Sequence, residues 1–120
     1  MVSDTDVIHG GEWLTVPEIM ERTGAGFAVV KRWLQDRELV GMRRGPNRAV
    51  MVPADFLLDD GPVPALRGTV TVLADGGFSD EEIIGWLHDP DETLEGGSAI
   101  ASLRAGSKTE VRRRAQEVAF

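Results

Sequence analysis

The chain has 120 residues and a formal net charge of −7, and it contains no cysteine. This length leaves room for one compact domain or for two small units that share one core. The absence of cysteine excludes disulfide bridges, thiolate metal sites and cysteine nucleophiles. No apolar run approaches the roughly 20 residues that cross a bilayer, and the first residues lack the pattern of a secretory signal. We therefore expect a cytoplasmic protein.

Charge is distributed unevenly along the chain. Residues 27–48, called the basic segment below, carry two acids and six bases, which are Lys31, Arg32, Arg37, Arg43, Arg44 and Arg48. Residues 49–106 carry eleven acids and two bases. Nucleic acid repels an acidic protein as a whole, but only the contacting face has to complement the phosphates. The basic segment therefore indicates a nucleic-acid contact, and a merely solvated charged face is the alternative.

Two short helices are predicted after a polar tail. Thr15 and Glu18 have the spacing of a capping box, in which each side chain accepts a hydrogen bond from the other residue's N–H at the start of a helix. The glycine-rich residues 23–26 interrupt this helix, and residues 27–36 resume the helical pattern. The apolar side of the second helix is formed by Val30, Trp33 and Leu34. Two short helices around a glycine turn predict a helix-turn-helix.

A β-hairpin is predicted next. Residues 40–43 and 49–52 are two short β-prone stretches, and the turn between them is rich in Gly, Pro and Asn. Residues 55–58 are expected to form a short helical or irregular connector whose apolar side chains dock on the core. Residues 59–62, with the sequence Asp-Asp-Gly-Pro, are the best internal boundary of the chain.

The second half is predicted to be helical throughout. Helices are expected over residues 64–75, 79–89, 98–105 and 107–120. Capping boxes are predicted for two pairs, Ser79 with Glu82 and Ser107 with Glu110. The periodicity of the last helix turns Val111, Ala115 and Val118 inward and Arg112, Arg113 and Arg114 mainly outward.

The predicted fold is mainly α with a small β-hairpin. A winged helix-turn-helix is followed by a C-terminal helical bundle. The predicted organisation is a flexible tail over residues 1–11, a winged helix-turn-helix over residues 12–58, and a helical unit over residues 62–120.

The first half resembles the winged helix-turn-helix of the excisionase and MerR-like superfamily. The residues that carry the resemblance are Leu14, Thr15, Gly24, Val30, Arg32, Trp33, Leu34, Leu39, Arg43 and Arg44. The resemblance implies a DNA-binding domain with a recognition helix over residues 27–36 and a basic wing over residues 40–52. Gly26 departs from the usual Ser or Thr cap of that helix, and Phe27 stands where a polar base contact is common.

The periodicity of the second helix indicates which side chains face DNA. If Val30 and Leu34 point inward, the side chains that face the major groove are Phe27, Ala28, Lys31 and Gln35. Arg32 is placed to bind a backbone phosphate. The wing contributes three further bases that are expected to contact flanking phosphates or the minor groove: Arg43, Arg44 and Arg48. Phe27 contacts a thymine methyl group or, if the turn is tight, belongs to the core. Phosphate contacts outnumber base contacts in this set, which predicts modest sequence specificity.

A wider resemblance covers nearly the whole chain. It is to an actinobacterial family of small winged-helix DNA-binding regulators, which includes a mycobacterial substrate of a membrane Ser/Thr kinase. The residues that carry it are Pro64, Leu66, Gly68, Leu73, Gly76, Gly77, Phe78, Glu82, Ile83, Trp86, Leu87, Pro90, Leu94, Arg112, Arg113, Arg114, Ala115 and Phe120. The likeness implies transcription regulation and a Ser/Thr kinase as partner. Thr5, between two aspartates, is the candidate phosphorylation site, with an unmodified tail threonine as the alternative.

The second half also resembles, more loosely, the toxin-binding domain of antitoxins of the parS type. This resemblance implies a protein partner or self-association through the C-terminal half. The alternative function is therefore a protein-interaction module, antitoxin-like or adaptor-like, that acts through the acidic helices.

The sequence predicts no enzyme, no cofactor and no metal site. His9 and His88 are far apart and belong to no motif, so both are expected to be isolated surface histidines. The acids at 80–82 are explained by helix capping, and those at 89–95 do not have the spacing of a calcium loop. The tryptophans, Trp13, Trp33 and Trp86, are expected to be core residues and not stacking platforms for bases.

Overall fold

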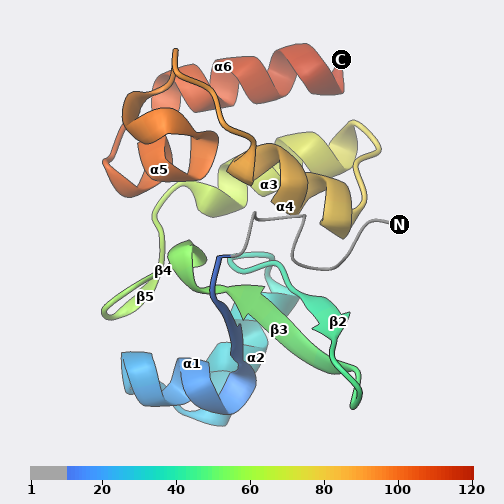
Figure 1. The fold of residues 1–120 in the computed structure, drawn as a ribbon, viewed down its shortest axis with the longest axis vertical. Coiled ribbons are helices and arrows are strands. Elements are labelled where there is room, and N and C mark those ends of the chain that lie inside the picture. The colour runs from blue at the N-terminus through green and yellow to red at the C-terminus, as the bar shows by residue number, and fades with distance from the viewer. Residues whose placement is uncertain (1–10) are drawn as a thin grey trace.

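The first half of the chain is built from two short helices and a small antiparallel sheet. The computed structural model describes residues 11–120 and places here β1 (Trp13–Thr15), α1 (Val16–Thr23), α2 (Phe27–Gln35), β2 (Met42–Arg44) and β3 (Ala49–Pro53). The strand order is β1, β3, β2, with both outer strands antiparallel to β3. In Figure 1 the two helices lie below this sheet.

The second half is helical apart from one small hairpin. The connection from the first half is formed by η2 (Ala54–Phe56), β4 (Leu57–Leu58) and β5 (Gly61–Pro62), and the elements that follow are α3 (Leu66–Asp75), α4 (Asp80–His88), η3 (Glu95–Gly97), α5 (Ala99–Arg104) and α6 (Lys108–Ala119). In Figure 1 the helices α3 to α6 occupy the upper part of the molecule. The predicted fold class, mainly α with a small β element, is confirmed.

The start of α1 follows the predicted capping chemistry. The Thr15 N–H donates to Glu18 Oε1 at 2.8 Å, and the Glu18 N–H donates to Thr15 Oγ1 at 3.4 Å. These bonds to Thr15 hold the pKa of the Glu18 carboxyl below its usual value. Gly24 ends the helix with a φ of 77°, a left-handed conformation that favours glycine. The glycine turn that joins α1 to α2 is therefore a property of the local sequence.

The sequence does not predict strand β1. It has three residues, too few for a visible alternation, and its partner β3 comes much later in the chain. Leu14 lies opposite Val52, and both are buried on the sheet face that contributes to the core. The pairing converts the predicted two-stranded hairpin into a three-stranded sheet.

The predicted boundary at residues 59–62 lies in a tight hairpin. Leu57 pairs with Pro62 and Leu58 with Gly61. Gly61 is buried and lies against Trp33, where a Cβ on this glycine would be 3.3 Å from a ring carbon of the tryptophan. The connection between the halves is therefore packed against α2.

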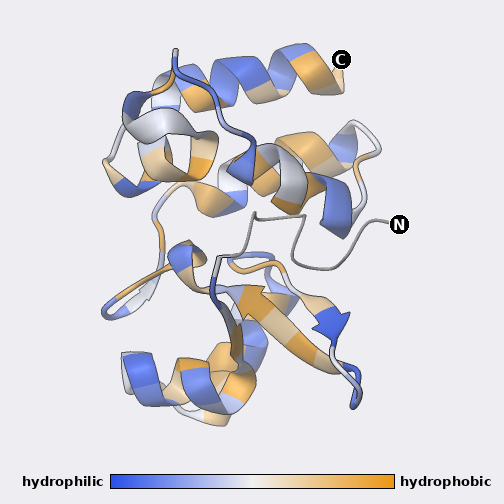
Figure 2. Ribbon diagram, viewed as in Figure 1, coloured by the Kyte–Doolittle hydropathy of each residue, from blue (hydrophilic) through white to orange (hydrophobic). Residues whose placement is uncertain are grey.

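The helices α3 and α6 run in the same direction at close range. A Cβ on Gly68 would meet the Arg112 guanidinium, and a Cβ on Gly76 would lie 2.7 Å from the Ala119 backbone. Figure 2 shows that α6 is largely hydrophilic with a few hydrophobic residues, whereas α3 is more hydrophobic. The buried apolar side chains of both halves form one continuous core that extends from Leu14 to Ala115.

Three predictions for the last helix are wrong. Ser107 makes no capping bond, because its Oγ donates to Glu95 Oε2 at 2.6 Å. Val118 is 50% exposed, since the packed side of α6 follows Val111, Ala115 and Ala119 at intervals of four residues. Arg114 is half-buried instead of outward-facing and reaches the loop after α4.

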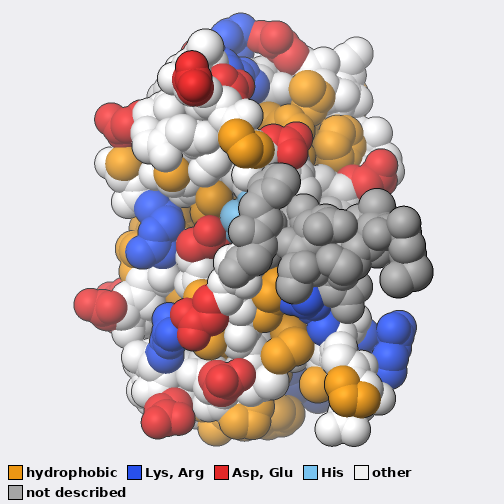
Figure 3. All heavy atoms as spheres, in the orientation of Figure 1, with side chains coloured by type: hydrophobic (Ala, Val, Ile, Leu, Met, Phe, Trp, Pro, Cys, Tyr) orange, Lys and Arg blue, Asp and Glu red, His pale blue; other side chains and the backbone are white. Residues whose placement is uncertain are grey.

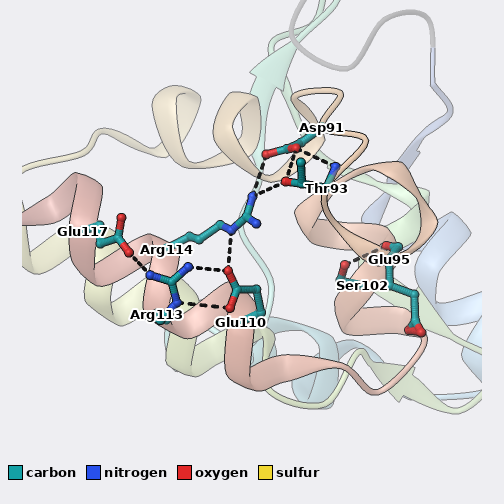
Figure 4. A network of polar contacts seen from close by, with 8 residues as sticks. All are labelled: Asp91, Thr93, Glu95, Ser102, Glu110, Arg113, Arg114 and Glu117. Carbon is teal, nitrogen blue, oxygen red and sulfur yellow. Dashed lines mark hydrogen bonds and ion pairs between the residues drawn. The ribbon is translucent and has the colours of Figure 1, made fainter.

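The inward position of Arg114 has a polar cause (Figure 4). Its Nη1 donates to Asp91 Oδ2 at 2.9 Å and to Thr93 Oγ1 at 2.7 Å, and its Nε donates to Glu110 Oε2 at 2.7 Å. The hydrogen bonds from Thr93, followed by the charge of Arg114, hold the pKa of Asp91 below its usual value. The acidic loop 89–95 is therefore tied to α6 through one arginine.

His88 is not an isolated surface histidine, so that prediction is also wrong. Its side chain is 8% exposed and lies where the two halves meet. Nδ1 is 2.8 Å from the Ile84 carbonyl oxygen, and Nε2 is 2.8 Å and 3.0 Å from the two Asp55 carboxylate oxygens. The ring stacks on Phe56 with centroids 5.4 Å apart. Tertiary packing alone brings these residues together, because 33 positions separate Asp55 from His88.

None of the described helices has the length and apolar character that a membrane crossing requires.

Candidate nucleic-acid interface

Helix α2 has one buried side and one exposed side. Val30 is fully buried, and Trp33 and Leu34 are half-buried against the core. At 100° per residue, the exposed side chains lie on one continuous arc of the helix. These are the five side chains of α2 that the sequence predicts to face DNA or its backbone: Phe27, Ala28, Lys31, Arg32 and Gln35. The structure brings this predicted set together on a single surface.

Phe27 belongs to this surface and not to the core. Its side chain is 58% exposed although it is the first residue of α2. The alternative of a tight turn that buries Phe27 is therefore excluded. The preceding Gly26 caps the helix without a side-chain hydrogen bond. Contact between Phe27 and a base stays a prediction.

The hairpin β2–β3 positions two further arginines. Residues 45–48 form its turn, closed by a 3.1 Å hydrogen bond from the Arg48 N–H to the Gly45 carbonyl. Arg43 Nη1 donates to the Arg48 carbonyl at 3.0 Å. Arg43 and Arg48 are both exposed. The guanidinium of Arg43 is therefore held at the turn by the backbone of Arg48.

Arg44 points to the other face of the sheet. Successive side chains of a strand alternate between faces, so Arg43 and Arg44 diverge. The Arg44 guanidinium carbon lies 4.1 Å from the centroid of the Trp13 ring, and the side chain is half-buried. This geometry is a cation–π contact that joins β2 to β1. Contact between Arg44 and DNA stays a prediction, and the structure gives this residue a role within the sheet.

The bases of the basic segment have different electrostatic partners. Arg37 pairs with Asp80 at 2.8 Å, which links the end of α2 to the start of α4. Four others make no ion pair with any residue in the described range: Lys31, Arg32, Arg43 and Arg48. Figure 3 shows basic side chains beside β2 and acidic side chains over α1. The unpaired positive charge of the first half is thus concentrated on α2 and the hairpin.

Two residues of this arrangement have no local signal in the sequence. Trp13, the platform under Arg44, is on a strand that the sequence does not predict. Asp80 is 43 positions away from the arginine it neutralises. Both partnerships depend on the tertiary structure.

The remaining predicted sites are outside this surface. Thr5 and His9 lie outside the described residues. Within residues 11–120, no group of three or more His, Cys, Asp or Glu side chains could hold a metal ion.

Three comparisons with known proteins agree with one another. Residues 63–119 match a family model described as the Rv2175c C-terminal domain of unknown function. The chain is 32% identical over 117 residues to the DNA-binding protein Rv2175c of Mycobacterium tuberculosis (strain ATCC 25618 / H37Rv). The aligned region covers 88% of this chain and 79% of that protein.

The structural comparison covers the whole chain. The NMR structure of Rv2175c superposes with a TM-score of 0.79 at 30% sequence identity, over 100% of this chain and 86% of that one. The actinobacterial family predicted from the sequence is confirmed by these matches. The chain belongs to the Rv2175c family.

Proposed function

We propose that this protein binds double-stranded DNA, catalyses no reaction, and acts in transcription regulation. One observation carries the proposal. In a chain of net charge −7, the bases Lys31, Arg32, Arg43 and Arg48 have no acidic partner among residues 11–120, although acids outnumber bases 20 to 13 in the sequence. The similar protein Rv2175c is named a DNA-binding protein, which supports the same function here.

Each part of the surface has a role in this proposal. Helix α2 enters the major groove, where Gln35 offers amide groups to base edges and Phe27 an apolar contact to a thymine methyl group. Lys31 and Arg32 approach the groove wall and the backbone. Arg43 and Arg48 at the hairpin turn hold flanking phosphates, which positions the helix without reading sequence.

The rest of the molecule favours a single orientation on DNA. The second half carries a net negative charge that disfavours its approach to phosphates, so the surface formed by α2 and the hairpin is the favoured contact with the duplex. Binding through four phosphate contacts releases condensed counterions. The logarithm of the affinity should therefore fall against the logarithm of the salt concentration with a slope of about −4.

A salt titration with matched variants tests the proposal. Binding to a 20-base-pair duplex of mixed sequence is measured by fluorescence anisotropy at several salt concentrations. The double variant Lys31→Ala, Arg43→Ala removes one base from α2 and one from the hairpin, and its slope should be about −2. The pair Arg67→Ala, Arg113→Ala removes the same charge from exposed positions of the second half and should keep the parent slope.

Two results would contradict the proposal. One is a parent slope near zero, which would mean that no phosphates are neutralised. The other is an equal loss for both double variants, which would mean that net charge and not this surface determines binding. In either case the protein-interaction function of the second half becomes the better explanation.

A further inference from the structure

A second basic site lies in the acidic half of the molecule. A hollow of about 370 Å³ opens between the end of α5, the start of α6 and the segment that precedes α3. Three cationic side chains line it, Arg104, Lys108 and Arg112, together with the apolar Leu58, Pro64 and Leu103. No acidic side chain of the described range lines this hollow. In Figure 1 α6 lies at the opposite end of the molecule from α2.

The three cations have no acidic partner among the described residues, in contrast to Arg113 and Arg114 on the same helix. Arg113 and Arg114 pair with Glu110, and Arg114 also pairs with Asp91. The second half is strongly acidic, so the lack of a partner for three neighbouring bases is not explained by a shortage of carboxylates.

One of the cations is held by hydrogen bonds, and a second packs against the backbone of α3. Arg104 Nη1 donates to the Asp55 carbonyl at 2.9 Å and to the Leu57 carbonyl at 2.7 Å. The guanidinium of Arg112 lies over the backbone of α3, where a Cβ on Gly68 would be 2.2 Å from its Nη2. The absence of a side chain at Gly68 therefore leaves the space that this guanidinium occupies.

The start of α6 adds to the positive character of this site. Ser107 does not cap the helix, because its hydroxyl is bound to Glu95. The only first-turn acid, Glu110, is occupied by Arg113 and Arg114. The partial positive charge of the helix N-terminus is thus added to the charges of Lys108 and Arg112.

We propose that this hollow binds the phosphate group of a small phosphomonoester. A phosphate carries close to two negative charges at neutral pH, which suits three cations better than a carboxylate does. Arginine guanidinium groups match the geometry of phosphate oxygens, and Lys108 supplies a third donor. The apolar side chains Leu58, Pro64 and Leu103 form the wall against which the organic part of the ligand lies. The site is separate from the proposed DNA surface and does not depend on it.

The test uses phenyl phosphate as the probe and the full-length chain. Amide signals of the ¹⁵N-labelled protein are followed during titration. Saturable shifts are expected at Leu103, Lys108 and Arg112, with weaker binding of benzoate, which has the same ring and a single charge. The variant Lys108→Ala should weaken phenyl phosphate binding roughly tenfold, as loss of a charge-assisted hydrogen bond implies. Lys31→Ala, on α2, should bind as the parent does.

A second variant separates binding from folding. Gly68→Ala keeps every charge but places a methyl group where the Arg112 guanidinium lies. It should weaken phenyl phosphate binding while the thermal midpoint stays the same or rises, because alanine is the better helix residue. A variant that merely unfolds would show the opposite change in the midpoint.

Three outcomes would overturn the proposal. They are the absence of saturable shifts up to millimolar phenyl phosphate, benzoate binding as tight as that of phenyl phosphate, and shifts that map to α2 and disappear in Lys31→Ala. The last outcome would assign phosphate affinity to the DNA surface alone.

Discussion

The role of each base in this protein depends on which side chain it meets. Arg43 and Arg44 are adjacent, yet one is exposed at the hairpin turn and the other lies over the Trp13 ring. Arg37 belongs to the same basic segment and is neutralised by Asp80. Charge counting along the sequence treats these residues alike, whereas the structure separates surface bases from bases that hold the fold together.

Arg44→Ala should lower stability more than it lowers intrinsic DNA affinity. The substitution removes the cation–π contact with Trp13, which is partly shielded from water and worth about 0.5 to 2 kcal/mol. Arg43→Ala, at the neighbouring exposed position, is the matched control and should leave the unfolding free energy unchanged within about 0.5 kcal/mol. Urea unfolding followed by circular dichroism measures both. Equal stability of the two variants would show that the contact with Trp13 contributes nothing.

At the scale of whole elements, two of the three predicted capping boxes form, and the third, at α6, does not. Thr15 with Glu18 and Ser79 with Glu82 form the predicted boxes at α1 and α4. At α6 the box is replaced by ion pairs, in which Glu110 binds Arg113 and Arg114 (Figure 4). Glu95 binds the Ser107 hydroxyl, and the two arginines one turn along the helix bind Glu110. Both members of the predicted box are therefore bound to other residues. The helix forms where it is predicted, but its first turn is held differently.

The ion pairs of α6 predict a pH dependence. Hydrogen bonds from Arg113 and then Arg114 lower the pKa of Glu110 from 4.5 to about 2. A folded-state pKa below the unfolded one stabilises the fold above pH 4.5, and this contribution is lost as the pH falls toward about 2. In Glu110→Gln the thermal midpoint should fall less than in the parent between pH 5 and pH 2.5, because the titrating group is absent.

Calorimetry at the two pH values measures this difference. Because Glu110 is exposed to solvent and screened, the effect should shrink in high salt. A parent and a Glu110→Gln variant with parallel pH profiles would contradict the role assigned to this carboxyl.

At the scale of the whole molecule, the two predicted units are joined by side-chain packing as well as by the backbone connection. The side chains of residues 12–58 and 62–120 contribute to one continuous core. Phe56 stacks on His88, Asp55 binds the same ring, and Arg104 donates to two carbonyls of the connection. An interface of this kind couples the stability of one unit to that of the other.

The protein should unfold in a single transition. In a urea titration followed by NMR, the amide signals of Val30 in the first half and Ile84 in the second half should disappear with one midpoint, because their core is shared. Asp55→Ala leaves the imidazole of His88 without its carboxylate partner and should lower that common midpoint. Two midpoints in the parent protein would show that the halves are separate folding units.

Local sequence alone determined the helices, the glycine turn between α1 and α2, the hairpin and the exposed arc of α2. These features depend on capping groups, backbone preferences and periodicity, all of which act within a few residues. The same short-range reasoning placed Phe27, Lys31 and Gln35 on one surface, since a single helix presents them.

Tertiary structure alone decided the third strand, the packed hairpin at residues 57–62, the inward turn of Arg114 and the environment of His88. Each depends on a partner far along the chain: Val52 for Leu14, Trp33 for Gly61, Asp91 for Arg114 and Asp55 for His88. A residue's own neighbours in sequence contain no information about such partners. For the same reason, the division of the bases into neutralised and unpaired ones follows from the three-dimensional arrangement and not from the order of charges.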